Sequence, residues 1–481
     1  MIPVPEVNLG GVLPALIISV AGLLAMLLGL FVRKGASTVG AVIGLVGVLL
    51  ALMANAPLRL MNTPAFSGMI ALDTYTWFFN LLILASVGLT ILISMKYLVD
   101  MGLDLYEYFA ILLFAAVGMM FMVSGIHLLV IFVGLETLSI AVYVLTGVLP
   151  RSAKSSEASL KYLLLGAFSS GLFLYGAALL FGATGSLSLA GLAKYFQSGS
   201  VSLMALVGMG LLLVGFSFKV AAVPFHMWTP DVYDGAPSPI TGFMSVGVKA
   251  AAFAAFLRVF FECFGSAQVT WSHILWVLAA LTMILGNLAA IVQTNIKRML
   301  AYSSIAHAGY ILVGMVAGKE GGAAGILYYL LAYIFTNLGA FAVVTIVGRK
   351  GEANVNIDDY RGLAKAHPAL ALVMSIFLFS LAGIPPTAGF VGKFTIFSAA
   401  INSGYIWLVI IGVLTSAASV FYYFRVVMKM YMEAPEVEPE KLLFSPSMTL
   451  ALTLTVMVVL YIGIFPTTYL NLATESVKTL F

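Results

Sequence analysis

Four charged residues lie inside long apolar runs of the sequence. One is Glu136, midway through HLLVIFVGLETLSIAVYVLTGVL, and the others are Lys219, Lys249 and Lys393. On insertion scales, a charge at the centre of a membrane helix costs about 2.5–3.5 kcal/mol. Ionisable groups kept at that depth usually mark a path for protons or ions, where each charge faces a partner or water. The four residues therefore predict ion translocation.

Glu136 needs a basic partner to stay charged in hydrocarbon, because desolvation favours the protonated carboxyl group. The candidate partners are Lys219 and Lys161, the latter on the following helix. A desolvated lysine releases its proton more readily, which a relay requires. Two alternatives stay open. The charges could form a buried pair that only holds helices together, and Lys161 could be an interfacial lysine whose ammonium reaches the membrane surface.

Two histidines and a serine could extend the same path. His307, in NIKRMLAYSSIAHAGYILVG, could relay protons near neutral pH, with Ser303 beside it. A histidine among serines is also an ordinary satisfied polar group. His226 follows Lys219 by two turns along the same helix face and could continue the path toward the more basic side of the membrane.

The composition requires a membrane around these residues. Of 481 residues, 62% are hydrophobic and only 9% are charged, which a soluble domain cannot accommodate. The net charge of +4 is small and the basic residues are scattered, so nucleic-acid binding is not indicated. The single cysteine, Cys263, excludes an intrachain disulfide. Met1–Gly10 has no basic residue, which predicts a first spanning helix and not a cleaved signal peptide.

The apolar runs predict an all-α polytopic membrane protein with about fourteen spans. If the N-terminus is outside, the basic residues divide unevenly between the two sets of loops, and the positive-inside rule places both termini on the outer side. The larger, inner set is Arg33, Lys34, Lys96, Arg151, Lys154, Lys297, Arg298, Arg349, Lys350, Arg361, Lys365, Arg425, Lys429 and Lys441. The outer set is Arg59, Lys194, Arg258, Lys319 and Lys478.

Two of the predicted spans, the seventh and the twelfth, are interrupted next to their lysines. The seventh reads VGFSFKVAAVPFHMWTP, with Pro224 shortly after Lys219. The twelfth reads SLAGIPPTAGFVGKF, where Pro385–Pro386 frees the carbonyls of Leu381 and Ala382. Irregular backbone at membrane depth persists only where protein or water satisfies it. Interrupted segments in corresponding positions indicate a transport site, whereas the alternative is a proline kink used for packing.

The same spacing suggests an internal duplication. Glu136 precedes Lys219 by nearly the interval that separates His307 from Lys393. Five helices per unit is an odd number, so the second unit would be inverted in the membrane. We therefore expect one transmembrane domain over residues 1–481, with the following parts: helices 1–3 in residues 1–100, a first antiporter-like repeat of helices 4–8 in 105–264, a second, inverted repeat of helices 9–13 in 271–432, and helix 14 in 445–481.

Several cofactor motifs are missing from the sequence. It has no GxxxxGK[ST] loop, no GxGxxG opening a soluble βαβ unit and no CxxC cluster. We therefore expect no nucleotide, flavin, iron–sulfur cluster or metal ion on this chain. Its energy source would be an ion gradient or another subunit.

PFHMWTPDVYDGAPSPITGFMSVGVKAAAF (224–253) closely resembles the corresponding segment of the subunit N family of NADH-quinone oxidoreductase, the antiporter-like membrane subunits of respiratory complex I. The resemblance extends to KRMLAYSSIAHAGY and AGIPPTAGFVGKF and covers essentially the whole chain. Related subunits and multi-subunit antiporters carry a WLPDAH-like sequence where this chain has WTPDVY. Lys393, where subunit M has glutamate, and the absence of a long lateral helix as in subunit L also favour subunit N.

The resemblance implies a proton channel of two linked half-channels. The matching positions are Glu136 (fifth-helix glutamate), Lys161 (neighbouring lysine), Lys219 (broken-helix lysine), Lys249 (central linking lysine), His307 (tenth-helix histidine) and Lys393 (lysine near the outer exit). It also implies that FMN, iron–sulfur clusters and quinone belong to partner subunits, with no NADH bound here. The partners would be other membrane subunits of complex I and the lipid of a bacterial inner membrane, with both termini periplasmic.

Two other functions remain compatible with the residues themselves. The chain could be a stand-alone or multi-subunit cation/proton antiporter subunit, which the buried charges would serve equally well. It could also be a structural subunit that moves no protons and uses its charges to fix helix packing.

Overall fold

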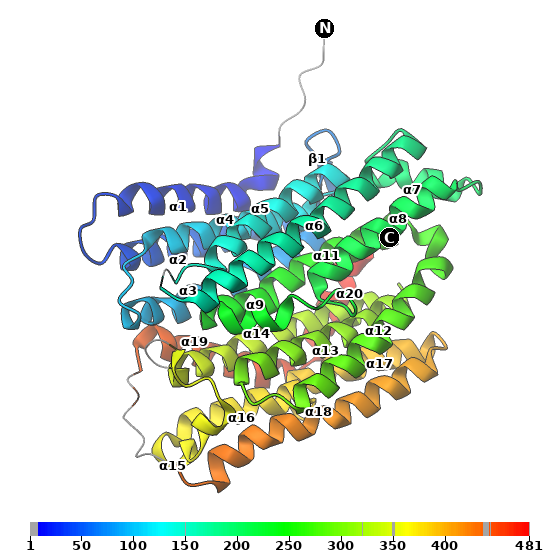
Figure 1. Ribbon diagram of the computed structural model, residues 1–481. Helices are drawn as coiled ribbons and strands as arrows, with labels where there is room; N and C mark the ends of the chain where they lie inside the picture. The colour runs from blue at the N-terminus through cyan, green and yellow to red at the C-terminus, as the bar shows by residue number, and fades with distance from the viewer. Residues whose placement is uncertain are drawn as a thin grey trace.

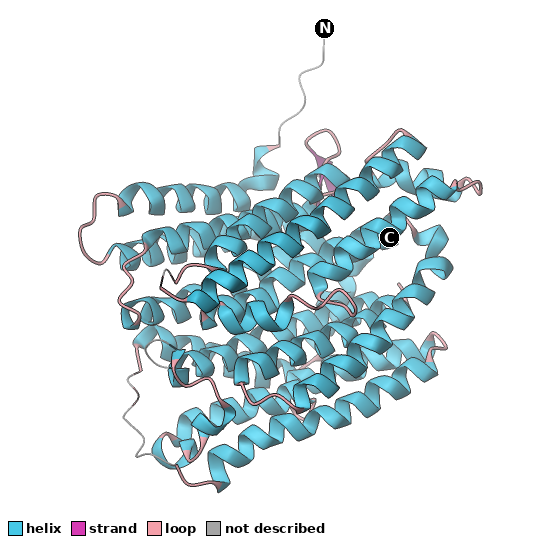
Figure 2. Cartoon of the chain, viewed as in Figure 1, coloured by secondary structure: helices cyan, strands magenta, loops and turns pink. Residues whose placement is uncertain are grey.

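The computed structural model describes residues 8–149, 151–319, 321–348, 352–435, 442 and 444–480. Arg349, Lys350 and Lys441, which we assigned to the inner side, lie outside these ranges. The described chain is a bundle of long helices that run alongside one another (Figures 1 and 2). The prediction of an all-α polytopic membrane protein is confirmed.

The long helices follow one another with short connections. In the first half they are α1 (Leu13–Gly29), α2 (Ala36–Asn55), α3 (Thr74–Asp100), α4 (Tyr106–Ser124), α5 (Leu128–Thr146), α6 (Ala153–Thr184) and α8 (Leu203–Val220). In the second half they are α11 (Lys249–Glu262), α12 (Gln268–Ile291), α13 (Ile296–Ala317), α14 (Gly322–Gly348), α16 (Pro368–Ala382), α17 (Ala388–Asn402), α18 (Ile406–Met432) and α19 (Pro446–Ile464).

Among the described residues, 13 helices are long and apolar enough to cross a membrane. The twelfth predicted span is divided into α16 and α17, each of 15 residues, and is not one of the thirteen. The count of fourteen spans therefore stays a prediction. Peripheral helices such as α1, α6 and α18 expose large apolar side chains, as lipid-facing helices do, whereas α13 and α14 are almost wholly buried.

Several short elements lie outside the fourteen predicted spans. A hairpin pairs β1 (Thr63–Ala65) with β2 (Ile70–Leu72), and the short helices α7 (Leu189–Gln197) and α20 (Thr467–Lys478) follow α6 and α19. On the other side of the bundle, between α14 and α16, the four-residue helix α15 spans Leu363–Ala366. These elements are too short to give a clear hydropathy signal.

The two ends of the bundle differ in their charges. At one end the start of the chain packs on the hairpin through Val12 and Leu72, Arg59 pairs with Glu475 of α20 at 3.4 Å, and Thr479 binds the amide of Tyr75. We call this the outer end, after the predicted orientation. The opposite, inner end carries ion pairs made by the larger basic set.

The seventh span is broken directly after its lysine. Helix α8 ends at Val220, because Ala221 takes a left-handed conformation with φ of 61°. A turn follows, and the short helix α9 (Thr229–Gly235) runs to residue 235. His226 lies in that turn, so the prediction that it continues the helix face of Lys219 is wrong. Pro224 and the left-handed residue end the helix before two further turns can form.

The eighth span begins as α10 (Ser238–Phe243), passes through a π-helical turn over Met244–Val248 and continues as α11. Lys249 is the first residue after that turn. Every residue of the central window of this span is buried by other helices. Near its outer end, Arg258 is 1% exposed and makes two hydrogen bonds, of 2.9 and 3.1 Å, to the carboxylate of Asp73, the N-cap of α3.

One backbone pattern occurs twice. Leu128 N donates to Leu187 O and Leu189 N to Ile126 O, at the start of α5. At the start of α13, Ile296 N donates to Val355 O and Ile357 N to Thr294 O, so each residue follows its counterpart by one constant interval. The first pair of hydrogen-bonded segments, 126–128 with 187–189, lies at the outer end of the bundle. The second pair, 294–296 with 355–357, lies at the inner end. The same interval carries Ser139 to His307 and Glu136 to Ser304.

Candidate functional site

Glu136 lies on α5 and is partly exposed as a residue, but its carboxylate oxygen Oε1 is buried and has no hydrogen-bond partner among the described residues. Lys219, on α8, is 3% exposed and interacts electrostatically with Glu136. No N–O distance between them is within the 4.0 Å of a salt bridge. Instead Lys219 Nζ donates to Ser139 Oγ at 2.7 Å, one turn along α5. The expected pair therefore interacts at longer range, with Ser139 as the direct contact.

Lys161 is bound elsewhere. It lies on α6, and its ammonium contacts Glu157 at 2.7 Å and Asp231 of α9 at 2.9 Å. Arg298, near the start of α13, binds the other oxygen of Asp231 at 2.8 Å. These groups, with Lys154 and Asp234, line an open cavity of about 190 Å³ at the inner end. Lys161 makes no salt bridge with Glu136 within 4.0 Å, so the prediction of direct pairing is wrong.

Lys249 is 2% exposed and reaches α13. Its Nζ donates to both the carbonyl and the hydroxyl of Ser304, at 2.8 and 2.6 Å. The π-helical turn adds one residue to the helix before Lys249, which sets where this side chain emerges. Ser304 lies one turn before His307 on α13, so the Lys249 ammonium binds α13 one turn from His307.

His307 is held on both ring nitrogens by tyrosines. Its Nδ1 lies 2.5 Å from the hydroxyl of Tyr329 on α14, and its Nε2 lies 3.1 Å from that of Tyr423 on α18. Tyr423 also contacts Ser303 Oγ at 2.6 Å. His307 and Ser303 therefore belong to one buried cluster that spans three helices.

Lys393 lies on α17, just beyond the break of the twelfth span, and is 5% exposed. Its ammonium donates to the carbonyls of Leu381 and Ala382 at 2.9 and 3.0 Å and to Ser416 Oγ at 2.8 Å. These are the two carbonyls that the prolines were predicted to free. The Lys393 ammonium thus supplies the hydrogen bonds that the carbonyls at the end of α16 lack.

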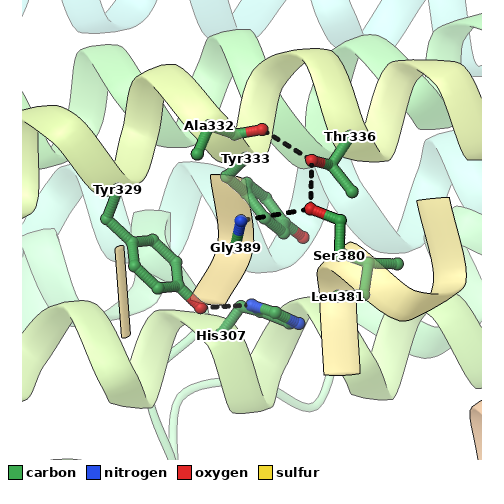
Figure 3. A pocket seen from close by; sticks show the side chains of 8 residues that line it. All are labelled: His307, Tyr329, Ala332, Tyr333, Thr336, Ser380, Leu381 and Gly389. Atoms are coloured by element: carbon green, nitrogen blue, oxygen red, sulfur yellow. Dashed lines mark hydrogen bonds between the residues drawn. The ribbon is translucent and has the colours of Figure 1, made fainter. Parts of the chain in front are cut away.

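A small pocket lies between His307 and the end of α16, lined by His307, Tyr329, Ala332, Tyr333, Thr336, Ser380, Leu381 and Gly389 (Figure 3). Thr336 Oγ1 and Ser380 Oγ are 3.1 Å apart, and the amide of Gly389 donates to Ser380 Oγ at 3.1 Å. Gly389 is needed for this approach, because a Cβ there would lie 1.9 Å from the Ser380 carbonyl oxygen.

The three deep lysines share one kind of partner. Lys219, Lys249 and Lys393 each donate to a serine hydroxyl and to no carboxylate within 4.0 Å among the described residues. A hydroxyl both donates and accepts, so it can bind an ammonium and a neutral amine alike. A carboxylate can only accept and would hold the proton on the lysine. This set of partners suits lysines that gain and lose protons.

The remaining candidates contribute less to this cluster. His226 lies in the turn after α8, and its Nδ1 has no hydrogen-bond partner among the described residues. No group of three or more His, Cys, Asp or Glu side chains in the described ranges could hold a metal ion. Ser303 was a sequence candidate, but the serines that bind the lysines, the tyrosines and the π-helical turn were missed from sequence. Their residue types are common in membrane helices, and only the packing of α5, α13, α14 and α18 brings them to the lysines.

Comparison with known proteins extends over nearly the whole chain. The family model of the NADH:quinone oxidoreductase/Mrp antiporter transmembrane region matches residues 125–419. NADH-quinone oxidoreductase subunit N of Trichlorobacter lovleyi is 48% identical over 98% of this chain and 97% of its own length. A chain of respiratory complex I from Thermus thermophilus is 35% identical, with a TM-score of 0.82 over 96% of this chain and 99% of that one.

A chain of the membrane-bound sulfane sulfur reductase, an archaeal respiratory membrane complex, is 25% identical over 98% of this chain and 97% of that one. Its TM-score of 0.87 shows the same arrangement of helices. With the broken spans, the buried lysines and these likenesses together, the chain belongs to the NADH-quinone oxidoreductase subunit N family.

Proposed function

We propose that the chain moves protons across the membrane as a subunit of NADH-quinone oxidoreductase, through Lys219, Lys249, His307 and Lys393, with Glu136 acting on Lys219. The observation that carries the proposal is the partner set of the deep lysines, which are bound to serine hydroxyls and carbonyls. Each ammonium is stabilised without a fixed counter-charge, so a neighbouring charge can change its proton affinity strongly in this medium of low dielectric constant.

The proposal includes two half-channels. In the first, a proton on Lys219 responds to Glu136 and passes to Lys249. In the second, it passes through the cluster of Ser304, His307 and the tyrosines to Lys393. The repeats at 105–264 and 271–432 would then be two inverted copies of one half-channel, and the recurring backbone pattern at opposite ends supports this. Ser139 would be the counterpart of His307, since one interval relates both pairs.

Lys161 has another place in this proposal. It helps Asp231 to join α6, α9 and α13 at the inner end, where protons would enter from the more basic side. We place His226, in the turn after α8, beside this proposed route. The larger basic set would face the bacterial cytoplasm, which puts both termini in the periplasm.

Redox chemistry belongs to partner subunits in this proposal. FMN, iron–sulfur clusters, quinone and NADH would be bound there, and electron transfer would drive proton movement through this chain. The neighbours would be other membrane subunits of the complex and the surrounding lipid.

The test is proton pumping by the assembled complex in vesicles. Glu136→Gln and Lys219→Ala should each lower the ratio of protons moved to electrons transferred, while other subunits still co-purify. Normal ratios in both assembled variants would exclude the relay and favour a structural subunit. Purification in mild detergent separates the remaining alternative, because an antiporter would exchange cations for protons without NADH-quinone reductase subunits.

A further inference from the structure

Tyr310 lies on α13 one turn after His307, and the ammonium of Lys393 lies over its ring. Lys393 Nζ is 4.8 Å from the ring centroid, within the range of about 6 Å in which an aromatic face attracts a cation. Tyr310 is 1% exposed and Lys393 is 5% exposed, so solvent screens this attraction little. The contact is therefore a desolvated cation–π pair.

The ammonium of Lys393 has no unused hydrogen to donate to Tyr310. Its three hydrogens match three acceptors, which are the carbonyls of Leu381 and Ala382 and the hydroxyl of Ser416. All three acceptors are neutral, and no carboxylate lies within 4.0 Å of the ammonium among the described residues. The face of the Tyr310 ring carries the negative part of the ring quadrupole, so its contact with Lys393 is electrostatic.

The position of the Tyr310 ring is set by several helices. Asn287 of α12 donates to the Tyr310 hydroxyl at 3.1 Å, and the hydroxyl of Tyr422 on α18 donates to Asn287 at 3.0 Å. Phe397 of α17 packs edge-to-face with the ring, with centroids 6.0 Å apart and planes at 83°. A ring held at its hydroxyl and by its neighbour keeps its place beside Lys393 when the lysine changes charge.

The first half-channel has no cation–π contact as close as this one among the described residues. Lys219 Nζ lies 5.8 Å from the ring centroid of Tyr143 and 6.0 Å from that of Phe218, at the limit of the range. Lys219 interacts electrostatically with the carboxylate of Glu136 instead. At Lys393, the aromatic face takes the place that the carboxylate has beside Lys219.

We propose that Tyr310 is a positioning residue for Lys393, whose ring face stabilises the protonated lysine and so sets how readily Lys393 accepts a proton from the His307 side. This rests on the proposed function and deepens it. Desolvation opposes the charged form of Lys393, so proton uptake is the step that needs stabilisation. A ring face supplies negative potential but cannot accept the proton, unlike a carboxylate, so it favours the charged lysine without competing for its proton.

A series of fluorinated phenylalanines at position 310 tests the electrostatics of the ring with little change in its shape. Each added fluorine withdraws electron density from the ring face and weakens its attraction for a cation. Starting from Tyr310→Phe, NADH-driven proton uptake by the assembled complex should fall stepwise as fluorines are added. The full loss should be about 2- to 30-fold, the factor that corresponds to one cation–π contact. A ring that only fills space predicts equal uptake throughout.

Phe341 supplies the matched control, because it is a phenylalanine in the wild type, lies on α14 and is 0% exposed. No cation lies over its ring among the described residues. The same analogues at position 341 should leave proton uptake unchanged. If Tyr310→Phe does not assemble, fluorinated tyrosines at position 310 keep the bond to Asn287 and should give the same order. Equal uptake across the series at 310, or an equal fall in the series at 341, would overturn the proposal.

Lys393→Ala separates the role of Tyr310 from the proposed function. If Lys393→Ala is impaired and uptake is constant across the fluorinated series, Lys393 carries protons without the ring, and only the role of Tyr310 is wrong. If Lys393→Ala pumps normally, the proposed function is wrong at this lysine and the role of Tyr310 is wrong with it.

Discussion

Lys219 donates its hydrogen bond to Ser139, and the carboxylate of Glu136 lies one turn away on the same helix. The charge and the hydrogen-bond acceptor are thus separate groups on α5. Glu136 can act on Lys219 through its field, while Ser139 keeps the ammonium in place. A direct ion pair would stabilise the protonated form of Lys219. The hydrogen bond to the neutral Ser139 hydroxyl instead allows Lys219 to release its proton.

Ser139→Ala should therefore impair pumping without breaking an ion pair. A hydrogen bond to a charged group contributes about 1.5–3 kcal/mol, so we expect proton uptake to fall by about tenfold or more. Ser139→Thr keeps the hydroxyl and should retain most of the activity. Proton uptake by vesicles, normalised to assembled complex, measures both, and equal activity of the two variants would contradict a role for the hydroxyl.

Lys249→Arg should impair coupled turnover about as much as Lys249→Ala. Arginine keeps the charge but does not release its proton, so it cannot serve a relay. If Lys249 only packed against Ser304, arginine would be tolerated and alanine would be harmful. NADH-driven quinone reduction and proton uptake separate these cases, and near-normal pumping by the arginine variant would rule out the relay role.

Glu352→Gln should destabilise the inner end. Lys297 is 0% exposed and binds Glu352 at 2.6 Å, and Glu352 also accepts from the amide of Ser238 and the hydroxyl of Tyr97. The variant leaves the buried Lys297 ammonium unpaired, which costs about 3–5 kcal/mol in such cases. Thermal unfolding of the purified complex measures the loss, and Glu475→Gln, from the exposed pair with Arg59, should have little effect.

The Glu352 carboxylate should also make the stability of the protein depend on pH. Burial raises the pKa of Glu352, but Lys297 and the amide of Ser238 outweigh it and hold the pKa below its usual value of 4.5. The stabilisation is therefore present above 4.5 and is lost as pH falls below it toward the folded-state pKa. The difference in unfolding temperature between wild type and Glu352→Gln should shrink on acidification through that range. A constant difference would contradict the assignment.

Cysteine labelling tests the orientation. Glu475 and Asp358 have exposed side chains at opposite ends of the bundle, at 58% and 60%. Cys263 is buried and should give little background. A membrane-impermeant reagent added to intact cells should label Glu475→Cys but reach Asp358→Cys only after the membrane is opened. The reverse pattern would overturn the proposed topology.

The spans and the deep charges could be predicted because both depend on local composition. A run of about 20 apolar residues must cross the membrane, and a lysine such as Lys393 within it stands out. The breaks could also be predicted, since proline removes a specific backbone bond: the freed carbonyls of Leu381 and Ala382 bind Lys393 as the sequence suggested.

The partners could not be predicted, because they depend on how distant helices pack. Lys161 and Glu136 are close in sequence order, yet Lys161 binds Asp231 on the segment after the seventh-span break. Ser139 and Ser304 are ordinary serines until α8 and α11 face them. The π-helical turn before Lys249 likewise has no marker in the sequence MSVGV.

The burial of the eighth span has a consequence for how the protein is made. This segment carries both Lys249 and Arg258 and touches other helices on all sides. A cation at the helix centre, as Lys249 is, adds about 2.5–3.5 kcal/mol to the insertion of an isolated helix into lipid, and Arg258 adds a second charge near the outer end. Asp73, which binds Arg258, lies at the start of α3 and is synthesised earlier. We therefore expect this span to leave the translocon only when α3 and its neighbours already stand in the bilayer to receive it.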